Sequence, residues 1–191
     1  MSAAIWWVRH GPTHAKSMVG WSDLPADLSD TAAVARLAAH LPAGAPVVSS
    51  DLSRAVATAD AIACGRPRLP NDPALREMHF GAWELQSAAE LEASDPARAR
   101  AFWDDPTAVR PPGGESWAEL CARVDAAADR LTARGGAVIA VAHFGAILSQ
   151  VQRAEGTEGP DAFAQRIDTL SVTRLTWDGR AWQAGPINHR P

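Results

Sequence analysis

Short apolar runs alternate with longer mixed stretches along this chain. Ile5–Val8 is the first such run, Val47–Val48 is a second, and Ala137–Ala142 is a third. Apolar runs of this length, bounded by polar and turn residues, are typical of buried strands. Because helix-length segments separate them, the pattern predicts an α/β fold, a three-layer α/β/α sandwich with a mostly parallel central sheet.

Helix start and stop signals fall in the intervening segments. Ser29 is placed to cap a helix over residues 31–41, which Pro42 ends. After the second apolar run, Asp51 is placed to cap another helix, which reaches Ala63. Both helices fit the alternation of strands and helices.

The second half of the chain carries clearer signals. Ser116 and Glu119 form a capping box, and the helix that they open keeps one apolar face until Gly135. A further helix is predicted after the third apolar run. In the tail, the stretch SVTRLTWDGRAWQ has two β-like arms around Asp178-Gly179, which predicts a hairpin.

One segment interrupts this regular order. Residues 85–103 have a helical pattern that is broken at Pro96, and the stretch DDPTAVRPPGGES that follows is expected to be a loop. We therefore expect one domain over residues 1–191, with a helical and loop insertion around residues 85–115 that covers the functional site.

Composition narrows the class of protein. The 191 residues are 47% hydrophobic and 21% charged, and the net charge of -4 comes with scattered basic residues, which argues against nucleic-acid or membrane partners. Two cysteines, Cys64 and Cys121, fit no metal-ligand spacing. The N-terminal apolar run is too short for a signal peptide or membrane span, so a cytoplasmic location is expected.

Unusual polar residues follow each of the three predicted strands. Arg9 and His10 come after the first, Arg54 lies in the first turn of the helix after the second, and His143 comes after the third. Ligands in open α/β sheets bind outside the carboxyl ends of the strands. Two histidines and two arginines are therefore expected to converge on one edge of the sheet.

The position of Arg54 points to an anionic ligand. A cation in the first turn of a helix opposes the helix dipole, and an anion bound between the two would remove that conflict. A phosphoryl group fits best, because two arginines can chelate its oxygens while a neutral imidazole attacks phosphorus and holds it covalently.

Phosphoryl transfer also needs a proton donor for the leaving oxygen. Glu77 lies in the segment LREMHFGAWE, together with the apolar residues Phe80 and Trp83. Those neighbours, and a nearby phosphate charge, would both favour a protonated carboxyl group. Glu84 lies in the same segment, and spacing alone does not decide between the two glutamates.

Five stretches carry a family resemblance. In chain order they are RHGPT, SSDLSRAVATA, LREMHFGAWE, PPGGESW and VAHFGAI. Together they resemble the signatures of the histidine phosphatase superfamily, the phosphoglycerate mutase-like group also called RHG phosphatases. The resemblance implies a phosphoglycerate mutase-like fold, and chemistry that requires neither a metal nor another cofactor.

The resemblance also assigns roles to the residues at the strand ends. It implies that His10 is the nucleophile that becomes phosphohistidine. Arg9, Arg54 and His143 would bind the transferred phosphoryl group and stabilise its charge in the transition state. Glu77, rather than the other glutamate of its segment, would protonate the leaving oxygen and then activate the water that releases phosphate.

The first signature is followed by two departures from the family pattern. Many relatives carry an acidic residue in place of Pro12 and a phosphoryl-binding asparagine in place of Lys16. Lys16, the only lysine of the chain, would either bind the substrate as a point charge or point into water. Thr13 aligns with a hydroxyl residue of the signature and is a candidate phosphate contact, or else caps the local turn.

The sequence thus predicts a metal-independent phosphomonoesterase acting on a small phosphorylated metabolite. The alternatives are a phosphomutase of the glycolytic type and a catalytically idle binding member; the chain is short for such a mutase and contains no tyrosine. Specificity is expected to depend on loops at residues 16–27, 86–112 and 156–166. Trp103 and Trp117, in or near these loops, are expected to pack rather than to stack on a ligand.

Overall fold

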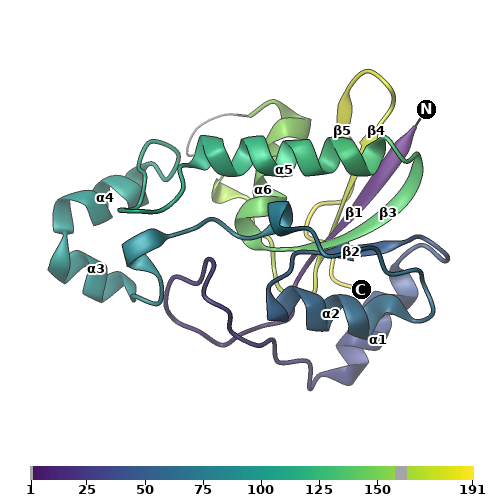
Figure 1. Cartoon of the computed structure of the whole chain (residues 1–191), viewed down its shortest axis with the longest axis horizontal. Coiled ribbons are helices and arrows are strands. Elements are labelled where there is room, and N and C mark those ends of the chain that lie inside the picture. Colours follow the sequence, from purple (N-terminus) through teal and green to yellow (C-terminus); the bar gives the residue numbers. More distant parts are fainter. Residues whose placement is uncertain (1, 158–162) are drawn as a thin grey trace.

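A single five-stranded sheet organises the computed structural model, which describes residues 2–157 and 163–191 (Figure 1). The strands are β1 (Ala3–Arg9), β2 (Val47–Ser49), β3 (Gly136–Ala142), β4 (Val172–Trp177) and β5 (Trp182–Ala184). Their order is β2-β3-β1-β4-β5, with β2, β3 and β1 parallel and the β4–β5 hairpin antiparallel. The α/β prediction is confirmed, and the sheet is mixed because the predicted hairpin adds two antiparallel strands to the parallel core.

Helices cover both faces of this sheet. They are α1 (Thr31–His40), α2 (Ser53–Ala63), α3 (Ala88–Ser94), α4 (Pro96–Asp104), α5 (Trp117–Thr132) and α6 (Phe144–Glu155), with short 3-10 turns η1 (Pro73–Leu75) and η2 (Gly81–Trp83). Side chains of a strand alternate between faces, so Trp7 packs with α5 and α6 whereas Val8 packs with α1 and α2. The result is the three-layer α/β/α arrangement seen in Figure 1.

Two predicted helix caps are wrong. The carboxylate of Asp30, not the hydroxyl of Ser29, caps α1. Helix α2 has Leu52 at its N-cap without any side-chain cap, because Asp51 accepts a 2.7 Å hydrogen bond from the Arg76 guanidinium instead. Arg76 binds both carboxylate oxygens of Asp51 through its Nε and one terminal nitrogen, so Asp51 ties α2 to the segment that carries Glu77.

The predicted capping box and the predicted break are both present. Ser116 and Glu119 cap α5 reciprocally, as the sequence indicated. The stretch before it forms two short helices, α3 and α4, separated at Asp95 just before Pro96. Helix α3 begins later than predicted, since Leu85 has a left-handed backbone with φ of 62°. Both helices extend beyond the end of the sheet (Figure 1).

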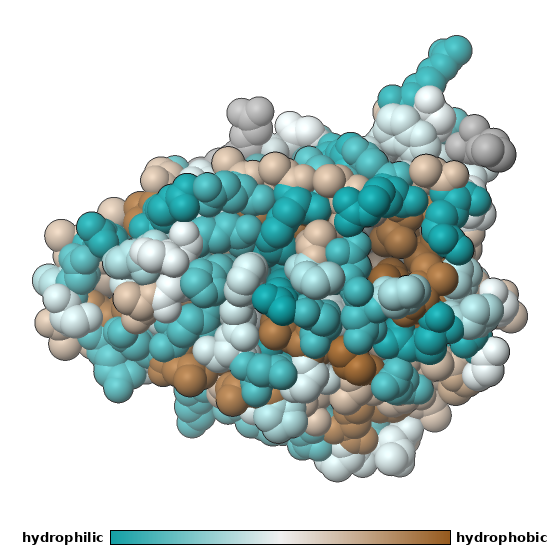
Figure 2. All heavy atoms as spheres, viewed as in Figure 1, coloured by the Kyte–Doolittle hydropathy of each residue, from teal (hydrophilic) through white to brown (hydrophobic). Residues whose placement is uncertain are grey.

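The outer surface is mainly hydrophilic on the face shown in Figure 2, where hydrophobic residues appear in small separate patches. Most large apolar side chains lie instead in two clusters, one on each face of the sheet. Within the described ranges, no helix has both the length and the apolar character needed to cross a membrane. The middle of the predicted specificity loop at residues 156–166 lies outside the described residues.

Candidate active site

The ends of β1 and β3 place two histidines side by side. The two strands are parallel neighbours in which Arg9 is paired with Ala142, so the next residues, His10 and His143, leave the sheet together. The backbone N–H of His10 donates to the Ala142 carbonyl at 3.1 Å, and the two imidazole rings lie 4.9 Å apart between centroids. Both side chains are buried, at 6% and 0% exposure.

Arg54 joins this pair from the first turn of α2. Its side chain is 1% exposed, and its Nε donates to Nδ1 of His143 at 3.3 Å. Its two terminal nitrogens donate to the carbonyls of Ser22 and Gly20 at 2.8 and 2.6 Å. Since a guanidinium has five N–H donors, two are left for a ligand. Through its Nε, the positively charged side chain of Arg54 is in direct contact with the ring of His143.

These hydrogen bonds determine where each imidazole carries its proton. Nδ1 of His10 lies 2.6 Å from the carbonyl oxygen of Gly11, which can only accept, so Nδ1 bears the proton and Nε2 keeps a free lone pair. Nδ1 of His143 faces an N–H of Arg54, which can only donate, so the proton of His143 is on Nε2. The first histidine thus offers a nucleophile and the second a donor.

The same surroundings keep both rings uncharged. Burial lowers the pKa of His10 to about 3, with the charges of Arg54 and Arg9 adding to the effect and the hydrogen bond to Gly11 opposing it. Burial also lowers the pKa of His143 well below its ordinary value, together with repulsion from His10 and the arginines. Both rings are therefore neutral at pH 7, the state in which an imidazole can attack phosphorus.

Two buried donors at the site lack a protein partner in the described part of the chain. They are Nε of Arg9 and Nε2 of His143. Another nitrogen of Arg9 donates to the carbonyl of Ile167 at 2.6 Å, and its guanidinium lies 5.6 Å from the centroid of the Phe144 ring. Buried donors are nearly always satisfied, so these two atoms point to an acceptor-rich ligand such as a phosphoryl group.

Glu77 adds a carboxyl group to the same cluster. Its side chain is 8% exposed, and its two oxygens accept from the backbone N–H of Gly145 at 3.0 and 3.1 Å. One oxygen also accepts from the N–H of Met78 at 2.9 Å. A Cβ at position 145 would lie 2.4 Å from that carboxylate, so glycine is required for this close approach. The side chain of Glu77 is thus held at the N-terminus of α6, where Gly145 is the second residue of the helix.

Glu84 has a different task. Its carboxylate accepts hydrogen bonds from the backbone N–H groups of Gly20, Trp21, Ser22 and Phe80. Burial raises the pKa of Glu84, but the hydrogen bonds outweigh it and hold that pKa below its usual value. Glu84 is therefore an ionised residue whose hydrogen bonds connect the loop at residues 20–22 to the segment that carries Glu77.

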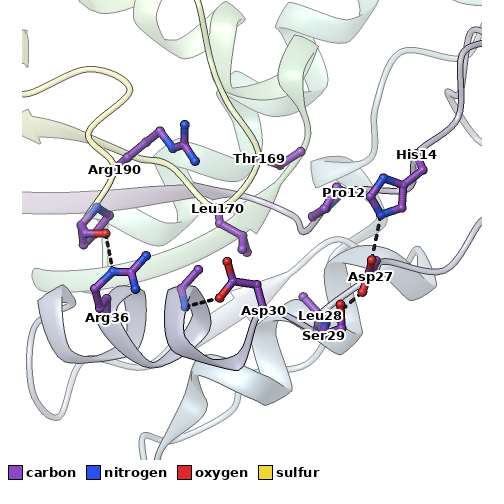
Figure 3. Close-up of a pocket in the computed structure, with 12 residues that line it drawn as sticks. Pro12, His14, Asp27, Leu28, Ser29, Asp30, Arg36, Thr169, Leu170 and Arg190 are labelled. Atoms are coloured by element: carbon purple, nitrogen blue, oxygen red, sulfur yellow. Dashed lines mark hydrogen bonds and ion pairs between the residues drawn. The ribbon is translucent and has the colours of Figure 1, made fainter.

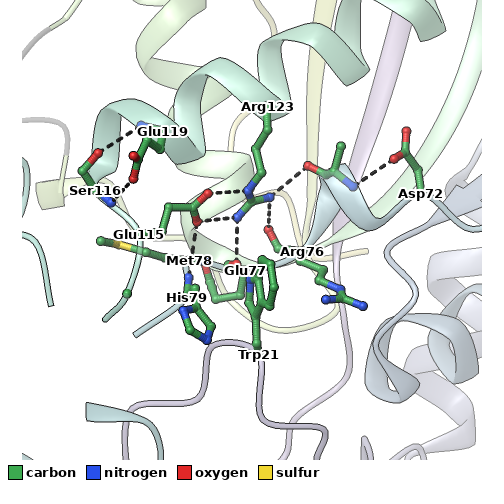
Figure 4. A network of polar contacts seen from close by, with 12 residues as sticks. Trp21, Asp72, Arg76, Glu77, Met78, His79, Glu115, Ser116, Glu119 and Arg123 are labelled. Atoms are coloured by element: carbon green, nitrogen blue, oxygen red, sulfur yellow. Dashed lines mark hydrogen bonds and ion pairs between the residues drawn. The ribbon is translucent and has the colours of Figure 1, made fainter. Parts of the chain in front are cut away.

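Arg123 of α5 fixes the backbone around Glu77 (Figure 4). Its guanidinium donates to the carbonyls of Ala74, Arg76 and Glu77 at 2.9, 2.7 and 2.8 Å, and two of its nitrogens pair with the carboxylate of Glu115. Sequence reasoning missed this residue. The signal that could have found it is a charged side chain at the edge of an otherwise apolar helix face.

The loop after the first signature is held by polar contacts with Asp27 (Figure 3). His14 contacts the carboxylate of Asp27 at 2.8 Å, and the N–H of Asp27 donates to the Pro12 carbonyl at 2.6 Å. These residues line a separate cavity of about 250 Å³. Thr13 is partly buried and Lys16 is exposed, and neither side chain has a hydrogen bond or ion pair within the described residues.

Neither cysteine lies in this cluster. Cys64 is exposed at the end of α2, and Cys121 is half-buried in α5, where burial raises the pKa of its thiol to about 11. Across residues 2–157 and 163–191, no three His, Cys, Asp or Glu side chains are grouped so that they could hold a metal ion. The ionisable groups of the cluster are the arginines, the two neutral histidines and Glu77.

Sequence comparison relates this chain to phosphate-handling proteins. Residues 5–189 match the model of the histidine phosphatase superfamily (branch 1). The probable phosphoglycerate mutase GpmB of Proteus mirabilis is 29% identical over 94% of this chain and 87% of that protein. The glucosyl-3-phosphoglycerate phosphatase of Mycolicibacterium vanbaalenii is 38% identical over 61% of this chain and 54% of that protein.

Solved structures agree with these matches. YhfR of Bacillus stearothermophilus superimposes with a TM-score of 0.90 at 26% identity, covering 97% of this chain and 96% of that one. The mycobacterial glucosyl-3-phosphoglycerate phosphatase superimposes with a TM-score of 0.85 at 27% identity, covering 98% and 99% of the two chains. The chain belongs to the histidine phosphatase superfamily.

Proposed function

We propose that this protein is a metal-independent phosphomonoesterase that hydrolyses a small phosphorylated metabolite through a phosphohistidine intermediate. The observation that carries the proposal is the state of His10, which is buried and neutral and keeps a lone pair on Nε2 beside the N–H of His143. An imidazole prepared in this way is a nucleophile, and the donors around it match the oxygens of a phosphoryl group.

The first step transfers the phosphoryl group to the protein. The lone pair of His10 Nε2 attacks phosphorus while the bond between phosphorus and the bridging oxygen breaks. Glu77 gives its proton to that oxygen, which leaves as an alcohol. Arg9, Arg54 and His143 bind the equatorial oxygens and stabilise the charge that develops on them.

The second step returns the protein to its starting state. Glu77, now a carboxylate, takes a proton from water, and the water oxygen attacks phosphorus. The bond from phosphorus to Nε2 breaks, its electron pair returns to His10, and inorganic phosphate leaves. The N–H of Gly145 supports this exchange because it donates to the ionised form of Glu77.

A phosphomutase is the second candidate, and the similarity to GpmB favours it. Both reactions share the phosphohistidine and differ in what attacks it, a water molecule or a hydroxyl group of another substrate. Several relatives are named as phosphatases, which supports hydrolysis. We therefore place hydrolysis first and transfer second.

Incubation of the purified protein with a panel of phosphomonoesters, in the presence of EDTA, tests the proposal. Phosphate release with chelator present, together with an acid-labile, base-stable phosphoenzyme, is the expected result. Added hydroxyl acceptors that capture most of the phosphoryl group would show a mutase instead. Release that requires a divalent metal, or turnover without any phosphoenzyme, would contradict the mechanism.

A further inference from the structure

The carboxyl group of Glu77 faces a second environment besides the histidine pair. A cavity of about 370 Å³, within the size range of small-molecule sites, is lined by both Glu77 and Gly145. The rest of its lining is apolar and mostly aromatic, and includes Met18, Phe80, Phe102, Trp103, Trp117 and Phe144. Because Phe144 also lies against Arg9, the cavity adjoins the phosphoryl-binding groups.

The chemistry of this cavity differs from that of a sugar-phosphate or carboxylate site. Glu77 is the only ionisable side chain among its described lining residues, and no lysine or arginine lines it. Lys16 is exposed and lies outside the lining. The indole N–H of Trp117 is already engaged, donating to the side-chain oxygen of Gln152 at 2.9 Å. A second anionic group or a row of hydroxyls would find few partners here.

The outer wall of the cavity combines one buried aromatic side chain with one that is half exposed. Phe102 is 5% exposed and packs edge-on against Trp83, with ring centroids 5.2 Å apart. Its neighbour Trp103 lies 5.3 Å from the Phe102 ring and yet is 48% exposed. Leaving so large an apolar surface in water costs free energy, which an apolar ligand would recover.

We propose that the substrate is a phosphate monoester of an apolar alcohol, whose alkyl or aryl part lies in this cavity. The bridging oxygen then lies at Glu77, where the cavity meets the histidine pair. This inference rests on the proposed hydrolysis and specifies the class of leaving group. Burial of the apolar part supplies the binding energy that holds phosphorus next to His10.

A series of straight-chain monoalkyl phosphates tests the proposal without changing the leaving-group chemistry. Ethyl, butyl and hexyl phosphate share the same kind of bridging oxygen and differ only in the apolar surface that they bury. We expect kcat/KM to rise roughly two- to fourfold for each added methylene, and to be lower for glycerol 3-phosphate than for butyl phosphate. A flat or falling series would overturn the proposal.

Truncation of the exposed wall locates the effect. Trp103→Ala should reduce kcat/KM for hexyl phosphate about tenfold and change that for ethyl phosphate less than about twofold. Trp177→Ala is the matched control, since Trp177 is paired with Ala3 at the opposite end of β1. Equal losses on both esters after Trp103→Ala would mean that the wall does not bind the alkyl group, and would overturn the proposal.

A binding measurement separates this proposal from the hydrolytic function. Alkylphosphonates cannot be hydrolysed, so calorimetry measures their binding without turnover, and the difference in affinity between a long and a short alkyl chain reports on the cavity. Hexylphosphonate should bind at least tenfold more tightly than methylphosphonate, and Trp103→Ala should remove most of the difference. That result without turnover of any ester would defeat the phosphatase function and keep the apolar site, whereas equal binding would defeat the apolar site.

Discussion

The two sides of the site are built in opposite ways. On the phosphoryl side, His10, His143 and Arg54 are at most 6% exposed, and backbone geometry at strand and helix ends holds them. On the leaving-group side, side chains such as Phe102 and Trp103 of α4 form an aromatic wall that is partly open to water. The contrast suggests that the chemistry is fixed by the sheet while selectivity is set by a separate helical segment.

Glu77 belongs to both sides, which makes it the point where the comparison can be tested. Changes on the phosphoryl side should affect every ester equally. Substitutions on the leaving-group side should change activity by an amount that depends on which alcohol the ester carries.

Removal of the proposed nucleophile gives the largest expected effect. His10→Ala should lower phosphate release by at least about ten-thousand-fold, and equally for ethyl and hexyl phosphate, because no covalent intermediate can form. Steady-state phosphate release and trapping of phosphoenzyme measure this. His14→Asn is the control: His14 is exposed with a φ of 57°, which asparagine tolerates, and it should retain activity within about twofold.

A His10→Ala protein that still forms phosphoenzyme would place the nucleophile elsewhere. The neighbouring His143 would then be the candidate. That outcome would also contradict the proton positions deduced for the two rings.

The contrast between the phosphoryl side and the leaving-group side also explains which parts of the site the sequence could predict. The strand ends were predictable because parallel strands deliver their carboxyl ends to one edge, which brings Arg9, His10 and His143 together whatever the loops do. Local patterns also predicted the capping box and the hairpin. The assignment of Glu77 over Glu84 needed either family resemblance or the structure.

What could not be predicted depends on packing between segments distant in sequence. The cap at Asp51 failed because Arg76, 25 residues away, competes for its carboxylate. Arg123 holds the Glu77 segment from another helix. Trp103 was expected to pack rather than to stack on a ligand, and the structure leaves it 48% exposed beside the cavity. A local pattern can mark such a side chain as unusual, but it does not show which distant segment the side chain contacts.

Loss of the proposed proton donor should have the next largest effect, and the size of this effect should depend on the alcohol that leaves. Glu77→Gln should lower kcat/KM for alkyl phosphates about 100- to 10,000-fold, because an alkoxide is a poor leaving group without a proton. For 4-nitrophenyl phosphate, whose leaving group needs little protonation, the loss in kcat/KM should be much smaller. The ratio of kcat/KM values for the two esters measures the effect, because kcat/KM reports on phosphoenzyme formation and not on the later release of phosphate, which is common to both esters.

Glu84→Gln is the matched control for this variant. It weakens the acceptor of several backbone N–H groups, so it should lower the melting temperature. It should leave the ratio of alkyl to nitrophenyl turnover unchanged. A larger change in that ratio for Glu84→Gln than for Glu77→Gln would exchange the roles of the two residues.

A smaller effect is expected from a change at Arg123, which holds the backbone of Glu77. Arg123→Lys keeps the charge but loses the fork that reaches three carbonyls and Glu115, so kcat should fall about tenfold while KM changes little. If Arg123 acts by positioning Glu77, the loss of activity should be greater for alkyl esters than for nitrophenyl esters. Arg130→Lys is the control, because Arg130 lies on the same helix as Arg123 and forms an exposed ion pair with Asp72. Equal losses on both esters would indicate general destabilisation only.

The neutral state of the buried histidines predicts how folding stability depends on pH. The pKa of His10 is about 3 in the folded protein and about 6.5 when the chain is unfolded. Between these values the unfolded chain binds a proton that the folded protein does not, so stability falls as pH decreases from 6.5. Above pH 6.5 both states are neutral and the contribution of His10 no longer changes.

Urea unfolding at pH 7, 6, 5 and 4.5 measures this contribution. Each buried neutral histidine adds a slope of up to about 1.4 kcal/mol per pH unit below 6.5, so His10→Gln should reduce the pH dependence by that amount. His14→Asn removes an exposed histidine instead and should leave the slope due to the buried pair in place. An unchanged slope in His10→Gln would mean that His10 binds protons alike in the folded and unfolded protein, and would contradict the lowered pKa of the buried ring.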